Sequence, residues 1–244
     1  MRRGEKVVGV IGGMGPEATV DFMRRVIAVT PARDDGDHLH ILVDNNPKIP
    51  SRIAALIEGT GEDPAPVLCE MAKGLEALGA DFLVVPCNTA HFYLPRIARS
   101  VDIPVLDMVD LSVKKLLATD AKPRHIGLLA SPAVRLVGLY SGKLEQAGLH
   151  AIFPSQQCEN ELLEIIKAIK AGQFSAEHRK GYTRIAGTLR DAGADALLIA
   201  CTELSVIGPP NDIDTPVVDT LDVLVEATIA SARKVQDVSQ NLGK

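Results

Sequence analysis

Short apolar runs alternate with longer amphipathic segments along the chain. Residues 82–85 and 196–200 are consecutive apolar positions, as in buried parallel strands, whereas residues 67–78 and 162–169 have apolar side chains at helical spacing. An alternation of strands and helices indicates parallel sheets covered by helices. The pattern therefore predicts an α/β fold.

The same pattern occurs twice. Gly-Ala-Asp and an apolar run lead to Cys87, and the same arrangement leads to Cys201. An opening strand at 6–12 matches 124–130, and a closing strand at 103–107 matches 215–219, at nearly constant spacing. We infer an internal duplication, in which each domain is a parallel sheet flanked by helices and the two are related by pseudo-twofold symmetry.

The predicted domains are residues 1–110 plus 220–244, and residues 111–219. Helices at 110–118 and 221–235 are expected to cross from one domain to the other, without a flexible linker between them. The last nine residues are expected to be frayed.

Composition agrees with this fold and excludes several classes of protein. The chain of 244 residues is 46% hydrophobic and only 3% aromatic, so its cores must be aliphatic, as in helix-covered parallel sheets. A net charge of −5 argues against binding to nucleic acid or to an anionic membrane. No apolar stretch approaches the roughly 18 residues of a membrane span. The first residues lead directly into a strand and leave no space for a signal peptide, so a cytoplasmic protein with reduced cysteines is expected.

Two of the four cysteines occupy matched positions. Cys87 and Cys201 each follow a buried strand, at the edge where open α/β sheets bind ligands, so a site between the domains would have one thiol on each side. Inert core cysteines are common, but the duplication favours a catalytic role for this pair. Cys69 and Cys158 fall outside the repeat and are expected to be structural.

Four segments carry a family resemblance: Gly12-Gly13-Met14-Gly15-Pro16-Glu17-Ala18-Thr19, Asn46-Pro47-Lys48-Ile49-Pro50-Ser51-Arg52, Pro86-Cys87-Asn88-Thr89-Ala90-His91 and Cys201-Thr202-Glu203. From about residue 7 to residue 230, the chain resembles the cofactor-independent aspartate/glutamate racemase family, in particular its aspartate racemase branch. The resemblance implies an amino-acid substrate, with aspartate first and glutamate second, and no cofactor. No set of residues has convincing metal-ligand spacing, so no metal is expected. A homodimer is a further possibility that the family suggests.

The chemistry of inversion explains a pair of thiols. A racemase removes the α-proton from one face and returns a proton to the other, so two acid/base groups on opposite faces suffice. Helices starting directly behind Cys87 and Cys201 would lower the pKa of both thiols. Their N–H groups and hydroxyls would also bind the substrate carboxylate.

Other candidate residues follow from the family pattern. The resemblance associates Arg52 and Lys170 with the distal carboxylate of the substrate, which suits the two-pronged guanidinium and the ammonium charge. The predicted substrate-binding residues are Met14, Arg52, Asn88, Thr89, Ser131, Lys170, Thr202 and Glu203.

One turn departs from the family pattern. The family usually has Thr-x-Gly-Thr after the second opening strand, whereas this chain has Ser131-Pro132-Ala133-Val134. We expect a smaller or more apolar pocket that lacks one hydroxyl, with Arg135 facing solvent.

Several alternatives remain open. Residues 13–18 satisfy the dinucleotide-binding pattern G-x-G-x-x-G/A, with Asp44 as a possible ribose ligand, but this leaves the second half unexplained. A cysteine-dependent isomerase or decarboxylase of a small diacid, of the maleate or malonate type, is a second possibility, although the decarboxylases need only one thiol. A non-catalytic protein on this scaffold is a third.

The histidines give no clear site. His38 and His40 lack an obvious third metal ligand, and His91 either tunes Cys87 or has a packing role in the core or at the surface.

Overall fold

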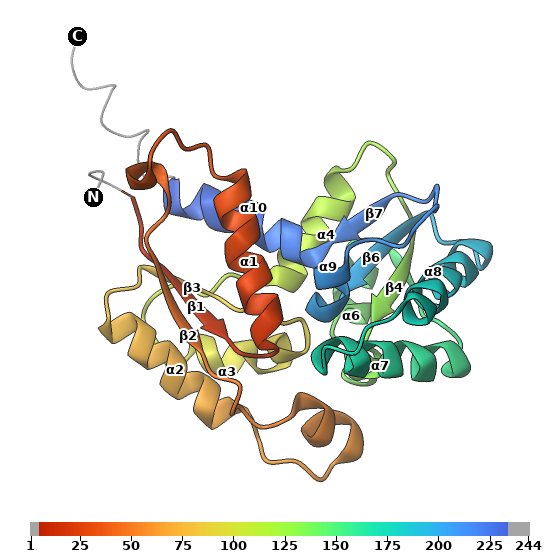
Figure 1. Cartoon of the computed structure of the whole chain (residues 1–244), viewed down its shortest axis with the longest axis horizontal. Helices are drawn as coiled ribbons and strands as arrows, with labels where there is room; N and C mark the ends of the chain where they lie inside the picture. Colours follow the sequence, from red (N-terminus) through yellow and green to blue (C-terminus); the bar gives the residue numbers. More distant parts are fainter. Residues whose placement is uncertain (1–4, 234–244) are drawn as a thin grey trace.

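The structure is a computed structural model that describes residues 5–233, and it consists of two α/β halves side by side (Figure 1). The chain start at residues 1–4, the last residues of the predicted crossing helix and the predicted frayed tail lie outside the described residues.

The first half contains a parallel sheet with the strand order β2-β1-β3. Its strands are β1 (Val8–Gly12), β2 (Ile41–Asn45) and β3 (Phe82–Val84). The predicted closing strand at 103–107 forms only one parallel bridge, between Leu83 and Val105. Around the sheet lie α1 (Pro16–Val29), η1 (Asp35–Asp37), the π-helical turn η2 (Ala54–Glu58), α2 (Ala65–Ala77), the 3-10 turn η3 (Thr89–Tyr93) and α3 (Leu94–Ala98).

The second half repeats this arrangement with the strand order β5-β4-β6-β7. Its strands are β4 (His125–Ala130), β5 (His150–Ile152), β6 (Ala196–Ala200) and β7 (Val217–Asp219), and all of them are parallel. Its helices are α5 (Pro132–Leu136), α6 (Ser141–Gln146), α7 (Gln156–Lys170), α8 (Ala176–Asp191) and α9 (Thr202–Ile207). Strands β4, β5 and β6 correspond to β1, β2 and β3, and β7 corresponds to the single bridge at Val105, which confirms the predicted α/β fold of two similar parallel sheets.

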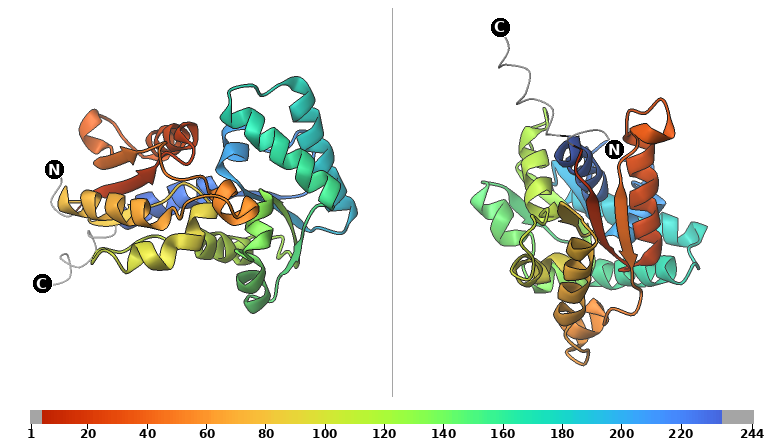
Figure 2. Two further views of the ribbon diagram at one scale, coloured as in Figure 1. Left: turned by 90° about the horizontal axis from the view of Figure 1, so that it is seen from below. Right: turned by 90° about the vertical axis from the view of Figure 1, so that its left-hand side faces the viewer.

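Two helices connect the halves. In α4 (Met108–Ala118), Val113 and Leu116 pack in an apolar cluster of the second half. In α10 (Thr220–Arg233), Leu221 and Leu224 pack with the first sheet and α1. The far end of α10 lies near the start of the described chain (Figures 1 and 2), where the Lys6 N–H donates to the carbonyl of Ala232 at 3.0 Å. Each half is therefore packed against a helix that directly follows the closing segment of the other half: α10 packs on the first half and α4 on the second.

The duplication extends to individual contacts. The Asp81 carboxylate accepts a hydrogen bond from the N–H of Val7 at 2.6 Å, and Asp195 accepts one from His125 at 2.9 Å. Both carboxylates thereby fix the start of an opening strand. Within residues 5–233, no helix combines the length and the apolar character that a membrane crossing requires.

Matched glycines show how tightly the central strands are packed. A Cβ on Gly9 would lie 2.5 Å from Cδ2 of Leu83, and a Cβ on Gly127 would lie 2.7 Å from Cδ2 of Leu197. Both leucines are fully buried, and the added atoms would also lie 2.9 Å from the Cβ of Ala80 and 3.1 Å from the Cβ of Ala194.

We expect Gly9→Ala and Gly127→Ala each to lower the free energy of unfolding by about 1–3 kcal/mol, because an extra methyl overpacks the core. Gly187→Ala is the matched control, because a Cβ at this helical position meets nothing within 4 Å. It should raise the free energy of unfolding by about 0.5–1 kcal/mol. Urea unfolding of the three variants measures the difference, and similar stabilities would contradict this account of the strand packing.

Candidate active site

One small cavity contains both matched cysteines. It has a volume of about 110 Å³, and it lies where the carboxyl ends of the two sheets face each other. The cavity is lined by Met14, Ser51, Arg52, Ile53, Cys87, Thr89, Ser131, Ile166, Lys170, Cys201 and Glu203. Two predicted site residues, Asn88 and Thr202, are not in this lining. Three further lining residues, Ser51, Ile53 and Ile166, were not predicted from the sequence, although the position of Ile166 one helical turn before Lys170 indicates the same helix face.

Cys87 lies in a short loop after β3. Its N–H donates to the carbonyl of Val85 at 2.8 Å, and the chain then enters the 3-10 turn η3 instead of the predicted α-helix. His91 Nδ1 lies 2.8 Å from the carbonyl oxygen of Cys87, and the N–H of Met108 donates to His91 Nε2 at 3.0 Å. Because Nε2 accepts, Nδ1 is the donor. Burial lowers the pKa of His91, so this buried imidazole is neutral and fastens the Cys87 segment to the start of α4.

Asn88 is turned away from the cavity. Its Nδ2 donates to Thr220 Oγ1 at 2.9 Å, and its Oδ1 accepts from the Tyr140 hydroxyl at 2.6 Å. Burial raises the pKa of Tyr140, which keeps this hydroxyl protonated as a donor. The predicted role of Asn88 as a substrate ligand therefore needs correction, because its amide connects η3 to α10 and to the second half.

Cys201 occupies the N-cap position of α9, directly after β6, without a capping hydrogen bond from its side chain. Its thiol donates to Glu203 Oε2 at 3.1 Å. Burial, together with the Glu203 carboxylate, raises the pKa of Cys201 well above its ordinary value. The predicted lowering of this pKa is therefore wrong, because the dipole of a short helix does not offset burial beside a carboxylate. Cys201 rests as a protonated thiol.

Lys170 reaches the cavity as half of an ion pair. The Lys170 ammonium donates to Glu203 Oε1 from the end of α7, opposite the oxygen that accepts from Cys201. Burial by itself would lower the pKa of Lys170, but the Glu203 carboxylate raises it. The lysine is therefore charged, and that charge is largely balanced before a substrate arrives.

Arg52 differs from Lys170 in this respect. Its guanidinium donates to the carbonyl of Pro50 at 3.1 Å, and no carboxylate within residues 5–233 forms an ion pair with it. Nearby, the hydroxyls of Thr89 and Ser131 lie 3.5 Å apart and join the two halves at the cavity wall. Arg52 thus supplies a positive charge that remains available to a ligand.

The altered turn after β4 affects the core more than the cavity. Ser131 lines the cavity, whereas Val134 is fully buried in the apolar cluster of the second half. The predicted effect of Val134 on the pocket is therefore wrong, because its side chain points into that core. Arg135 is half exposed and pairs with Glu159 at 3.1 Å, in agreement with the expected solvent-facing position.

Thr202 is buried, and its hydroxyl has no hydrogen-bond partner among the described residues.

The glycine segment has a role within the protein. Gly13 has a φ of 95°, and a Cβ there would collide with the backbone of Asn46. Its N–H donates to Thr19 Oγ1 at 3.0 Å, and the loop brings Met14 to the cavity. These contacts account for the glycine without a nucleotide and remove the main argument for a dinucleotide site. The part of the chain that the structure describes has no cluster of three or more His, Cys, Asp or Glu side chains suited to a metal ion.

Comparisons with known proteins cover nearly the whole chain and agree on one family. The sequence model of the Asp/Glu/Hydantoin racemase family matches residues 11–228. The structure of Picrophilus torridus aspartate racemase superposes with a TM-score of 0.83 at 33% identity, covering 93% of this chain and 94% of the other. A broad specificity amino-acid racemase from Bacillus subtilis is 26% identical over 234 residues, which is 92% of this chain and 97% of that protein. The chain therefore belongs to the Asp/Glu/Hydantoin racemase family of enzymes.

Proposed function

We propose that this racemase inverts the α-carbon of a small amino acid, with aspartate as the first substrate and glutamate as the second, and that Cys87 and Cys201 are its two acid/base groups. The observation that carries the proposal is that one thiol from each half lines the same cavity of about 110 Å³. A site of this size suits a small metabolite, since pockets for larger ligands span about 300–1,000 Å³.

The proposed reaction uses the two sulfurs in sequence. In one direction, the Cys87 thiolate takes the α-proton, the Cα–H electron pair remains on the substrate as a carbanion, and the Cys201 thiol protonates the opposite face. The enzyme then holds a Cys87 thiol and a Cys201 thiolate. This direction starts from the protonated Cys201 that burial and Glu203 favour. Polar groups on the cavity wall, including Thr89 and Ser131, would stabilise the charge on the substrate carboxylate.

The reverse direction requires Cys201 to lose its proton first. Glu203 Oε2, at 3.1 Å from the sulfur, is the acceptor, and Lys170 on the other carboxylate oxygen orients this group. Glu203 therefore takes part in proton transfer at Cys201, in addition to any contact that it makes with a substrate.

Charge at the cavity supports an acidic substrate. Lys170 and Glu203 largely cancel, whereas Arg52 has no carboxylate partner among the described residues. A distal carboxylate would balance Arg52, and the planar guanidinium can donate two parallel hydrogen bonds to it. Aspartate and glutamate provide that group, and alanine does not.

Replacing either thiol should abolish racemisation. We expect Cys87→Ser and Cys201→Ser each to lower the racemisation rate by about 10²–10⁴-fold, the range for loss of a general acid or base. Chiral chromatography of each L- and D-amino acid, without added pyridoxal phosphate, measures the rate and identifies the substrate. Cys69→Ser is the control, because Cys69 does not line the cavity. A single cavity variant with a normal rate would refute the two-thiol mechanism.

Glu203→Gln should shift the pH dependence of the direction that begins with deprotonation of Cys201. Since the Glu203 charge raises the pKa of this thiol, its removal lowers the pKa, and the rising limb of kcat/KM moves to lower pH. The maximal rate should fall, because the proton acceptor is lost. Glu159→Gln is the matched control, a buried carboxylate paired with Arg135 outside the cavity. A rising limb that stays in place or moves to higher pH would exclude this role.

Arg52→Ala should change specificity more than overall activity. A charge-assisted hydrogen bond contributes about 1.5–3 kcal/mol, so kcat/KM for aspartate should fall about ten- to a hundredfold relative to alanine. Arg52→Lys should recover only part of this loss, because an ammonium lacks the guanidinium fork. Arg135→Ala is a control that removes an arginine beyond the cavity lining. Equal losses for acidic and neutral substrates would show that Arg52 does not bind the distal carboxylate.

A further inference from the structure

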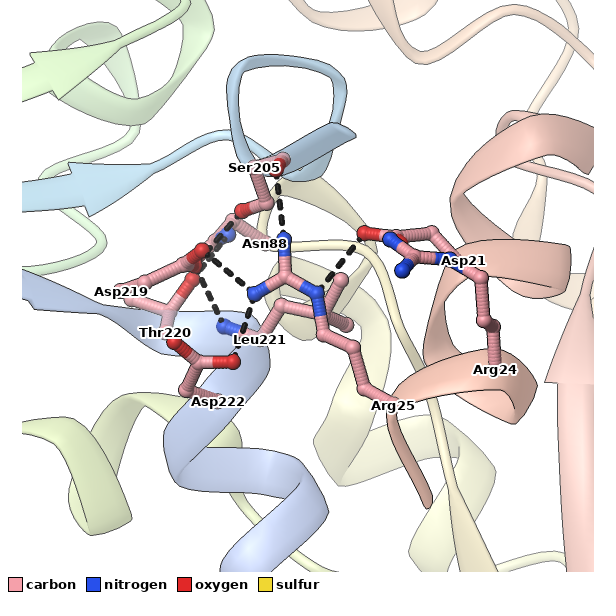
Figure 3. Close-up of polar contacts among 9 residues, drawn as sticks. All are labelled: Asp21, Arg24, Arg25, Asn88, Ser205, Asp219, Thr220, Leu221 and Asp222. Carbon is pink, nitrogen blue, oxygen red and sulfur yellow. Dashed lines mark hydrogen bonds and ion pairs between the residues drawn. The ribbon is translucent and has the colours of Figure 1, made fainter. Parts of the chain in front are cut away.

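Both cysteine segments form hydrogen bonds with the same short stretch of chain, residues 219–222, which is the end of β7 and the start of α10 (Figure 3). Asn88, which follows Cys87, donates to Thr220 Oγ1 at 2.9 Å. Ser205, one turn after Cys201 in α9, donates its hydroxyl to Asp219 Oδ1 at 2.6 Å. The separation of the two thiols therefore depends on how this stretch is held.

A single arginine of the first half holds it. Figure 3 shows the Arg25 side chain extending from α1 toward α9 and the start of α10. The guanidinium donates within its own helix to Asp21 Oδ2 at 2.9 Å, and across the interface to Asp219 Oδ2 at 2.8 Å, Asp222 Oδ1 at 2.6 Å and the Ser205 carbonyl at 2.5 Å. One side chain thus joins α1, α9 and α10.

The arrangement is well shielded from water. The side chains of Arg25 and Asp219 are 16% and 9% exposed. Burial raises the pKa of Asp219, and the hydrogen bonds from Ser205 and Arg25 oppose that shift. Removing the guanidinium would leave a buried carboxylate without its ionic partner, so the segment would have to rearrange to reach water or another cation.

A corresponding cluster lies at the start of α4, where the second half supplies the cation and the chain of the first half supplies the carboxylates. Lys143 of the second half donates to Asp107, at the end of the closing segment of the first half, at 2.6 Å, and also to Asp110 in the first turn of α4. Asp107 and Asp219 occupy matched positions in the duplication, and each caps the helix that follows it. His91 takes the place of Ser205 as the contact from the cysteine segment to that helix. The Lys143 side chain is 36% exposed, so this second cluster is the weaker of the two.

We propose that Arg25 is a positioning residue for racemisation, which keeps Cys201 in register with Cys87 by fixing Ser205 and Asp219. The inference rests on the proposed two-thiol function. In such a reaction, both sulfurs must reach one carbon at about 3–3.5 Å from opposite faces, and a displacement of about 1 Å can cost about a hundredfold in rate.

The test compares Arg25→Met and Arg25→Lys with Arg24→Met. Arg24 is the matched control, because it is the adjacent residue of α1 and binds the same Asp21. Its side chain is 70% exposed, and within residues 5–233 it forms no hydrogen bond with the second half. The readouts are kcat, KM and, in D₂O, the deuterium ratio, which is the amount of deuterium incorporated into recovered substrate divided by the amount of inverted product. If the thiols are out of register, the carbanion is protonated more slowly on the opposite face. The sulfur that removed the proton then has time to exchange it with D₂O and to return a deuteron to the same face, so this ratio rises.

We expect Arg25→Met to lower kcat about ten- to a hundredfold with little change in KM and with a raised deuterium ratio. Arg25→Lys should lie between this variant and the unaltered protein, because it retains the charge beside Asp219 without the fork. It also provides the same deuterium readout if Arg25→Met does not fold.

Activity of Arg25→Met equal to that of Arg24→Met would overturn the proposal. So would a loss of activity at an unchanged deuterium ratio, which a smaller folded fraction alone would produce. Normal racemisation by Cys87→Ser or Cys201→Ser would instead refute the two-thiol function itself, whatever Arg25 does.

Discussion

The site depends on the exchange of α4 and α10 between the halves. A parallel sheet presents ligands at the carboxyl ends of its strands, and one sheet alone would place one thiol on one side of a substrate. The crossing helices hold the two carboxyl edges face to face, so that both cysteines line one cavity. The side-chain contacts of Asn88, His91 and Ser205 all lead to the start of one of these helices, at Thr220, Met108 and the preceding Asp219.

Charge within the cavity is distributed unevenly, and this gives the matched thiols different surroundings. Cys201 faces Glu203, which is in turn paired with Lys170, whereas the fold attaches the Cys87 segment through the neutral His91. An internal duplication thus supplies symmetric backbone positions, and local substitutions after each cysteine make the two sides chemically distinct. A racemase must work in both directions, but its two proton carriers need not be alike.

The sequence predicted the architecture well, because strand burial and duplication both appear as patterns along the chain. Most of the predicted site residues also line one cavity, since residues directly after strand ends must lie at the sheet edge. The misassigned features depend on side-chain direction and local environment, which periodicity does not encode. Asn88 and Val134 are adjacent or close to cavity residues but point into the interface and the core. The pKa of Cys201 was misjudged because burial and Glu203 act against the helix terminus.

The exchanged helices also determine the order in which the protein can be assembled during synthesis. Val8 and Phe22 share an apolar cluster with Leu221 and Leu224, so the first half lacks part of its core until these residues of α10 have left the ribosome. The core of the second half needs α10 only as far as Val223, whereas the core of the first half extends to Ala232. Although N-terminal domains generally fold first during translation, here the half that is synthesised first is completed last.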